Sequence, residues 1–257
     1  MKQFKIDLNS DLGEAFGNYS LGMDQDILAY VTSANVACGF HAGDPLVMDK
    51  TVALAAKKGV AIGAHPGFPD LQGFGRRNMA CTPSEVKSYI QYQLGALQAF
   101  CTAQGQCLQH VKPHGALYNM AAKDKALALA IAEAVKAVAP KAILLGLAGS
   151  EMLKAGRQLG LRVASEVFAD RAYQADGSLV PRSQKGAVIH NVDLVLERTL
   201  KMVQQGTVTA ITGEEVPLEA HSICVHGDNP QAVEFVARLK AYLEAHGVEL
   251  APLSHIV

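Results

Sequence analysis

The chain has 257 residues, of which 49% are apolar and 18% are charged, and its formal net charge is −1 at pH 7. This length and balance favour a single folded α/β domain over residues 1–257 and exclude a disordered or fibrous protein. The small net charge provides no general attraction to nucleic acid or to an anionic membrane, so we expect neither as a partner.

Cysteine usage and the first residues indicate a cytoplasmic protein. The five cysteines are odd in number, widely spaced and without a CxxC pair, which predicts neither a disulfide framework nor a structural zinc site. The amino-terminal sequence MKQFKID places charge where a signal peptide needs an apolar core. The apolar run at 142–148 is too short to cross a bilayer.

Short apolar runs alternate with longer helical patterns along the chain, as is typical of repeated βα units and a parallel sheet. The expected strands are 4–9, 34–37, 60–64, 108–112, 142–147, 161–166, 208–212 and 223–226. Seven or eight parallel strands in a chain of this length favour a closed or nearly closed (β/α) barrel over an open sheet.

Capping signals predict four of the helices between these strands. They run from Asp44-Pro45 to Gly59, from the capping box at 82–85 to Gly105, from Ser150 to near Gly160, and from Asn229-Pro230 to near 246–247. The loops 66–81 and 168–186 are longer than a connector requires. We interpret them as functional loops, since long ordered loops in compact domains often carry function.

Four histidines, His41, His65, His114 and His226, each lie within two residues of a glycine and just after a short apolar run. Side chains at the carboxyl ends of parallel strands converge on one face of a barrel, where glycine lets a ligand approach the backbone. The chain is therefore expected to be an enzyme. Five other histidines are expected to be structural: His110, His190, His221, His246 and His255.

Carboxylates gather at the end of the first strand, where Asp7 and Asn9 share one face and are followed by Asp11 and Glu14. Such a cluster favours a functional site, although hydrogen bonds to neighbouring backbone also suit Asp7 and Asn9. We expect Asn35 and three histidines to lie nearby, at the end of the barrel where the strands finish. This end of the barrel suits either a divalent metal or general acid–base chemistry.

Positively charged residues and the absence of phosphate-binding motifs limit the classes of substrate that we expect. Lys112, Arg171 and the pair Arg76-Arg77 suit a substrate carboxylate or an oxyanion, with solvated surface charge as the alternative for the pair. The sequence has no GxxxxGK[ST] loop and no dinucleotide fingerprint. We therefore predict no nucleotide site of a recognisable kind on this chain.

Six strings of the sequence are similar to those of a known family: IDLNSDLGE (6–14), NVACGFHAGD (35–44), GAHPGFPD (63–70), VKPHGALYN (111–119), EVFADRAY (166–173) and CVHGD (224–228). Together they closely resemble the LamB/YcsF lactam-utilisation family, the family of the A subunits of bacterial 5-oxoprolinase. The resemblance covers nearly the whole chain.

The resemblance implies a distorted TIM-like barrel of the glycoside hydrolase/deacetylase type. It also implies an ATP-dependent opening of 5-oxo-L-proline to L-glutamate together with partner subunits B and C. ATP would then be a co-substrate used through the complex, and a divalent metal is a further candidate cofactor.

The resemblance marks positions, and the roles at those positions are our hypotheses. The catalytic candidates are Asp11, His41, His65, His114 and Lys112, and the substrate-binding candidates are Asp7, Asn9, Glu14, Asn35, Asp170 and Arg171. Either Asp11 or His41 would activate water, while His65 and His114 would transfer protons or hold a metal. The ammonium group of Lys112, expected at the barrel mouth, would bind an anionic group with Arg171.

Two alternatives remain open at this point. A free-standing metal-dependent deacetylase or amidohydrolase would also need the Asp and His clusters, and activity without ATP or partners would identify it. A binding or regulatory component that no longer catalyses is the second alternative, since folds of this kind are reused. Against that alternative, a binding module has little need for so many titratable groups at strand ends.

Overall fold

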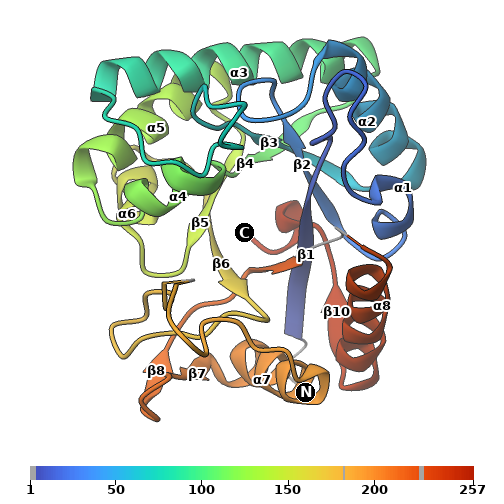
Figure 1. Ribbon diagram of the computed structural model, residues 1–257, viewed down its shortest axis with the longest axis vertical. Helices are drawn as coiled ribbons and strands as arrows, with labels where there is room; N and C mark the ends of the chain where they lie inside the picture. Colours follow the sequence, from blue (N-terminus) through green and yellow to red (C-terminus); the bar gives the residue numbers. More distant parts are fainter. Residues whose placement is uncertain (1–3, 182, 226–228) are drawn as a thin grey trace.

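Seven parallel strands form a closed barrel in the computed structural model, which describes residues 4–181, 183–225 and 229–257 (Figure 1). The described residues contain ten strands in all: β1 (Phe4–Leu12), β2 (Ser33–Ala37), β3 (Ala61–His65), β4 (Leu108–Val111), β5 (Ile143–Leu147), β6 (Val163–Phe168), β7 (Thr207–Thr209), β8 (Glu215–Pro217), β9 (Ser222–Val225) and β10 (Val248–Leu250). The barrel runs β1-β2-β3-β4-β5-β6-β9 and closes by the pairing of β9 with β1, while β10 pairs with the first residues of β1.

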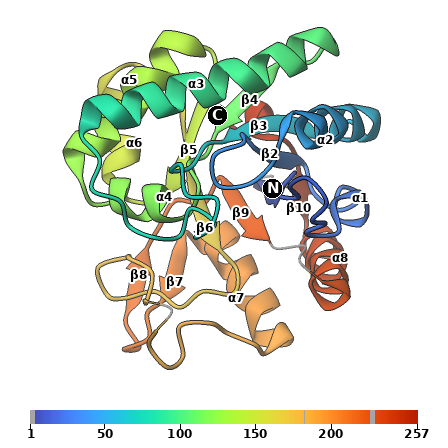
Figure 2. The same ribbon diagram turned by 45° about the horizontal axis from the view of Figure 1, so that its top comes forward.

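The helices surround this barrel (Figure 2). They are α1 (Asp24–Ile27), α2 (Pro45–Lys58), α3 (Pro83–Ala103), α4 (Gly115–Ala121), α5 (Lys125–Val138), α6 (Glu151–Gln158), α7 (Val192–Gln205), α8 (Pro230–Ala245) and the short 3₁₀ helix η1 (Leu253–His255). In Figure 1, α3 crosses the top of the molecule and α7, β7 and β8 lie at the bottom. The fold is the TIM-like α/β barrel that the sequence predicts.

The capping residues fix where the predicted helices begin. Asp44 accepts hydrogen bonds from the backbone N–H groups of Leu46 and Val47, and Gly59 ends α2 in the left-handed conformation. Thr82 and Glu85 form the predicted capping box at the start of α3. α2 follows β2 and α3 follows β3, and both helices begin at the mouth of the barrel. The loops between each strand and its helix therefore lie at the mouth.

One predicted strand is wrong as a barrel strand. The sequence predicts that the segment 208–212 joins the parallel sheet, but β7 covers Thr207–Thr209 and pairs with β8 in a separate antiparallel two-stranded sheet. The reason is a tight turn at 210–213, in which the Gly213 N–H donates to the Ala210 carbonyl and lets the chain reverse. Within the described residues, the barrel therefore has seven strands.

The register of the sheet sets polar residues of neighbouring strands beside one another inside the barrel. Asp7 lies opposite Ser222, and Asn9 lies opposite Cys224. Asp11 lies opposite Asn35 on β2. Successive strand residues point to opposite faces, so Asp7, Asn9 and Asp11 form one ladder that rises toward the mouth.

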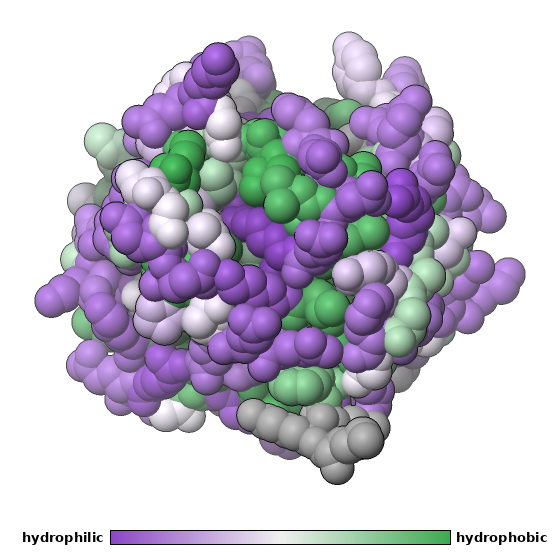
Figure 3. Space-filling view, turned by 90° about the horizontal axis from the view of Figure 1, so that it is seen from below, coloured by the Kyte–Doolittle hydropathy of each residue, from purple (hydrophilic) through white to green (hydrophobic). Residues whose placement is uncertain are grey.

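The face of the molecule seen in Figure 3 is mainly polar. Figure 3, which views the molecule from below Figure 1, shows hydrophilic residues over most of the face, with hydrophobic residues gathered near its centre. Among the described residues, no helix combines the length and the apolar character needed to cross a membrane.

Candidate functional site

A cavity of about 610 Å³ opens beside the ends of the barrel strands. Its lining includes the catalytic candidates Asp11, His65, Lys112 and His114. Both long loops contribute to its walls, the first through Arg76 and Asn78 and the second through the segment 178–181. Both of the loops that we interpret as functional therefore border the cavity, and their function stays a prediction.

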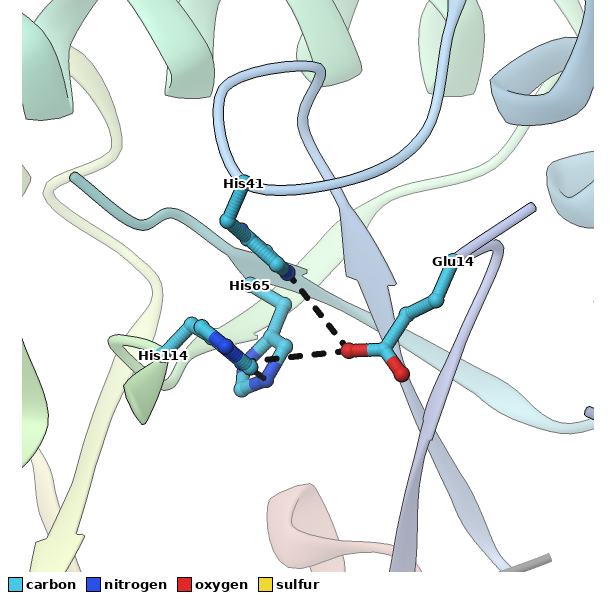
Figure 4. Close-up of side chains that lie close together, drawn as sticks. All are labelled: Glu14, His41, His65 and His114. Carbon is cyan, nitrogen blue, oxygen red and sulfur yellow. Dashed lines mark hydrogen bonds and ion pairs between the residues drawn. The ribbon is translucent and has the colours of Figure 1, made fainter. Parts of the chain in front are cut away.

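Three histidines and a glutamate meet beside the cavity, and Figure 4 shows them pointing toward one another. His41 Nε2 lies 3.5 Å from Glu14 Oε1, and His114 Nδ1 lies 3.8 Å from the same oxygen. His65 Nε2 lies 2.9 Å from His114 Nδ1, and the rings of His41 and His114 stack with 3.7 Å between their centroids. Each residue offers one ligand atom within 4.8 Å of the others, so the group could hold a metal ion.

Two backbone carbonyls orient the rings of this cluster. The Lys112 carbonyl lies 2.7 Å from His65 Nδ1, and the Phe74 carbonyl lies 2.8 Å from His114 Nε2. A carbonyl only accepts, so each of these ring nitrogens carries a proton and donates. Phe74 has a left-handed backbone conformation, with φ of 53°, which is strained for a residue other than glycine.

Glycines let the backbone pack directly against the imidazoles. A Cβ atom added at Gly67 would lie 2.6 Å from His41 Nδ1, and one added at Gly75 would lie 2.8 Å from both His41 and His114 atoms. The buried side chain of Gln93 on α3 holds Gly67 in place, because it accepts from the Gly67 N–H and donates to the Gly67 carbonyl. The position of His41 is thus supported by a helix and a loop behind the ring.

The imidazoles of His41 and His114 are kept neutral near pH 7. Burial lowers the pKa of His41 well below its ordinary value of 6.5, and the neighbouring histidines lower it further. Burial and the charge of His65 lower the pKa of His114 to about 3. Neutral imidazole is the form that binds a metal or accepts a proton.

A second polar group surrounds Lys112, which is 4% exposed. Its Nζ donates to Asp11 Oδ1 at 2.9 Å and to Asn9 Oδ1 at 3.1 Å, and it lies 3.0 Å from Glu166 Oε1. It also donates to Cys224 Sγ at 3.3 Å. The ammonium group expected to bind substrate anions is therefore placed between two carboxylates of the protein itself.

The charges of this group stabilise one another. Burial alone would raise the pKa of Asp11, but the charges of His65 and Lys112 hold it well below the ordinary value. Burial alone would lower the pKa of Lys112, but Asp11, Cys224 and Glu166 hold it well above the ordinary value. Asp11 and Lys112 are thus both charged over the whole neutral range.

Asp7 lies deeper in the barrel than a substrate-binding role requires. It is fully buried and accepts hydrogen bonds from the hydroxyl groups of Thr32, Ser33 and Ser222 at 2.5–2.6 Å. Burial raises its pKa to about 6. Asp7 is not among the residues that line the cavity, and its contact with substrate stays a prediction.

Asn9 and Asn35 connect this lower layer to the mouth. Asn35 donates through Nδ2 to Asn9 Oδ1 and Asp11 Oδ1, and it accepts from His110 Nε2 at 2.6 Å. The His110 ring occupies space beside Gly63 that a Cβ atom would fill. His110, which the sequence predicts to be structural, thus helps to orient Asn35.

The remaining predicted residues lie around the second long loop. Arg171 lines the cavity and donates to the carbonyls of Val180 and Ala187, so it also holds this loop together. Asp170 borders a second cavity of about 330 Å³, which is also lined by Cys224. His226 lies outside the described residues.

Three residues of the site, Glu166, Tyr118 and Cys224, are not predicted from the sequence. Glu166 is fully buried, accepts from Asn9 Nδ2 at 3.0 Å and from the Tyr118 hydroxyl at 2.6 Å, and neighbours Lys112. The signal that could have found it is a glutamate at the end of an apolar strand, a position that requires a buried partner. Tyr118 and Cys224 carry no comparable signal, because both residue types are common in cores.

Comparisons with known proteins agree on one family. The profile of the LamB/YcsF family matches residues 6–257. A Coprothermobacter proteolyticus protein that is named as the A subunit of 5-oxoprolinase is 61% identical over 98% of this chain and 97% of its own length. A Bacillus subtilis protein of the same name is 57% identical over 98% of both chains.

Solved structures show the same barrel. The lactam utilization protein from Thermus thermophilus is 48% identical, with a TM-score of 0.92 over 96% of this chain and 99% of that one. A structure described as T48 deacetylase with substrate has a TM-score of 0.50 at 14% identity, over 99% of this chain and 90% of that one. This second likeness shows a shared fold only.

Proposed function

Because the chain belongs to the LamB/YcsF family, we propose that it is the A subunit of an ATP-dependent 5-oxoprolinase. Its substrate would be 5-oxo-L-proline and its product L-glutamate. The relatives named as A subunits of 5-oxoprolinase support this proposal, and their name also supports partner subunits, which would be B and C. The whole chain, residues 1–257, would act as one catalytic domain in a cytoplasmic complex.

The chemistry explains why ATP would be needed. A five-membered lactam is a poor electrophile, because the amide nitrogen donates electron density to the carbonyl. Transfer of the γ-phosphoryl group of ATP to the amide oxygen, with loss of ADP, makes the ring carbon more reactive. Water then adds to that carbon, the C–N bond breaks as the nitrogen takes a proton, and a second water hydrolyses the acyl phosphate to glutamate and phosphate.

Asp11 is the residue that supports this chemistry best. Its side chain is 22% exposed, lines the cavity and lies 3.3 Å from His65 Nε2 through Oδ2. His41, the other candidate for activating water, is fully buried and does not border the cavity among the described lining residues. Because the pKa of Asp11 is low, its carboxylate would be ionised and would orient the attacking water by accepting a hydrogen bond from it.

Cations at the cavity wall suit the carboxylate of 5-oxoproline. Arg76, Lys123 and Arg171 line the cavity, and Lys112, which also lines it, is already paired with Asp11 and Glu166. Arg76 would therefore be the first candidate for the substrate carboxylate, since arginine binds carboxylates in a bidentate manner. Lys112 would act by holding Asp11 ionised and in position.

A free-standing metal-dependent amidohydrolase or deacetylase is the second candidate. The observation that favours it is the group of Glu14, His41, His65 and His114, which resembles the donor set of hydrolytic metal sites. Such an enzyme would open or deacylate its substrate without ATP and without partner subunits.

One assay separates the two candidates. The purified chain is incubated with 5-oxoproline, with and without ATP and with and without subunits B and C, and glutamate release is measured. We expect release only when ATP and both subunits are present, because the chain has no recognisable phosphate-binding loop. Strong ATP-dependent release by the chain alone would contradict the need for partners, and release without ATP would favour the second candidate.

A further inference from the structure

We propose that Glu14, His41, His65 and His114 form a binding site for one divalent transition-metal ion of the zinc type. The site lies beside the cavity at the mouth of the barrel. The proposal goes beyond the lactam reaction, because metal content is measured without turnover and either candidate reaction is compatible with it.

The first argument is a pair of ring nitrogens that face each other. His65 Nδ1 and His114 Nε2 donate to the Lys112 and Phe74 carbonyls, so the opposite nitrogens carry lone pairs when the two rings are neutral. These two nitrogens are 2.9 Å apart. Two lone pairs at this distance repel each other, and either a shared proton or a metal ion bound by both nitrogens removes the repulsion.

The second argument is His41, which is fully buried. Neither of its ring nitrogens makes a hydrogen bond to any residue that the structure describes. A buried polar group without a hydrogen bond costs about 1–3 kcal/mol, so such a group usually indicates a ligand. Its Nε2 faces Glu14 Oε1 at 3.5 Å, which places an oxygen ligand on the same side.

The distances suit four ligands around one small ion. Zinc lies about 2.0–2.1 Å from imidazole nitrogen and carboxylate oxygen, so tetrahedral ligand atoms are about 3.4 Å apart. The observed separations of 2.9, 3.5 and 3.8 Å lie on both sides of this value. Small movements of the side chains would therefore complete the site.

The donor set selects the class of ion. Three imidazoles and one carboxylate favour zinc and its first-row neighbours, whereas magnesium and calcium prefer oxygen ligands alone. The carbonyls that bind the outer nitrogens of His65 and His114 are the usual outer partners of metal-binding histidines. Glu14 offers a carboxylate oxygen and the three histidines offer ring nitrogens, all within 4.8 Å of one another.

The site is closed on one side and borders the cavity on the other. His65 and His114 line the cavity together with Asp11, whose Oδ2 lies 3.3 Å from His65 Nε2. Gly67 and Gly75 pack against the rings from behind. A ligand in the cavity would therefore reach the ion past Asp11.

Metal binding by the full chain is the direct test. The purified protein is stripped with a chelator and dialysed against Zn²⁺ or Co²⁺, and the bound metal is counted by elemental analysis. We expect one ion per chain, an increase in Tm with added Zn²⁺, and a Co²⁺ absorption spectrum typical of nitrogen and oxygen ligands. A wild-type chain that binds no Zn²⁺ or Co²⁺ overturns the proposal and leaves a shared proton between His65 and His114.

Variants locate the ion. His65→Gln and His114→Gln are expected to weaken Zn²⁺ binding at least about a hundredfold, because each removes a ligand. His255→Gln is the matched control, since His255 is exposed and distant from the mouth. The assignment of the ligands is wrong if the His65 and His114 variants bind metal as well as the control does. It is also wrong if the Co²⁺ spectrum of the wild type shows thiolate ligands. This spectrum remains the test where a variant does not fold.

Discussion

Two polar groups lie side by side at the mouth of this barrel and differ in how fully their atoms are paired. The group around Lys112 satisfies its members internally, since the ammonium contacts Asp11, Glu166, Asn9 and Cys224. The group around His41 instead holds facing nitrogens and a ring without hydrogen bonds among the described residues. The first group lies inside the barrel with its charges paired, and the second is the group that we propose to bind a metal ion.

The largest expected effect is on the internally paired group. Lys112→Met keeps most of the alkyl stem but leaves the buried Glu166 and the partly buried Asp11 without their cation, so we expect a loss of about 3–5 kcal/mol in the free energy of unfolding. Urea denaturation measures it. This differs from the near-normal stability expected if Lys112 were a simple substrate-binding residue at the mouth.

Lys154→Met is the matched control, because Lys154 is exposed and pairs with Glu151 at the surface. We expect it to change the free energy of unfolding by less than about 1 kcal/mol. If Lys112→Met changes the free energy of unfolding as little as Lys154→Met does, Asp11 and Glu166 do not depend on the charge of Lys112. The group around Lys112 would then not be stabilised by its internal pairing.

The next effect concerns pH and the deeper residues. In the folded chain the pKa of Asp7 is raised to about 6, so the native state binds more protons than the unfolded state between about pH 4 and 6. Asp7 therefore lowers stability as the pH rises through this window. The loss in the free energy of unfolding that Asp7 causes is up to about 3 kcal/mol, since each pKa unit corresponds to about 1.4 kcal/mol. Asp7→Asn should remove it.

His110 acts with the opposite sign. Burial and the charge of Lys112 lower its pKa to about 3, so the unfolded state binds more protons between about pH 3 and 6.5. The stability that comes from the neutral ring is lost as the pH falls through this range. The free energy of unfolding, measured at several pH values, should fall less at low pH in His110→Gln than in the wild type and fall more in Asp7→Asn. If its dependence on pH is the same in the wild type and both variants, the pKa shifts of Asp7 and His110 are wrong.

A third effect tests the boundary between the two groups. Asp11→Asn keeps the shape of the side chain but removes the charge that contacts both Lys112 and His65. We expect turnover by the complete complex to fall at least about a hundredfold, the scale of misplacing a reacting group in an active site. Asp193→Asn, on an exposed side chain, should leave the rate of glutamate release unchanged; equal rates in both variants would show that Asp11 is idle.

Much of this architecture follows from local signals in the sequence. The alternating pattern of β1 predicts the ladder of Asp7, Asn9 and Asp11, and capping residues such as Asp44 predict helix starts. The partners of these residues do not follow from the sequence, since Lys112 and Glu166 meet only when β4 and β6 close into one barrel. The same limit applies to the Phe74 carbonyl, whose direction depends on a left-handed residue in a long loop.

The smallest effect separates the shape of the histidine group from its chemistry. Gly67 provides no ligand atom, yet a Cβ atom there would lie 2.6 Å from His41 Nδ1 and must displace the ring. Gly67→Ala is therefore expected to weaken Zn²⁺ binding about tenfold, the lower range for a change in the support of a ligand, while leaving all four ligand residues in place. Titration of the stripped protein with Zn²⁺ measures this.

Gly95→Ala provides the control, because Gly95 lies in α3 and a Cβ atom there meets nothing within 4 Å. It should keep the affinity for Zn²⁺ and raise the free energy of unfolding by about 0.5–1 kcal/mol, since alanine favours a helix over glycine. A tenfold loss in Gly67→Ala with none in Gly95→Ala would show that the backbone behind His41 is built to position that ring. Equal affinities in the two variants would mean that the His41 ring can shift without loss of Zn²⁺, and the close packing of Gly67 behind it would then have no part in metal binding.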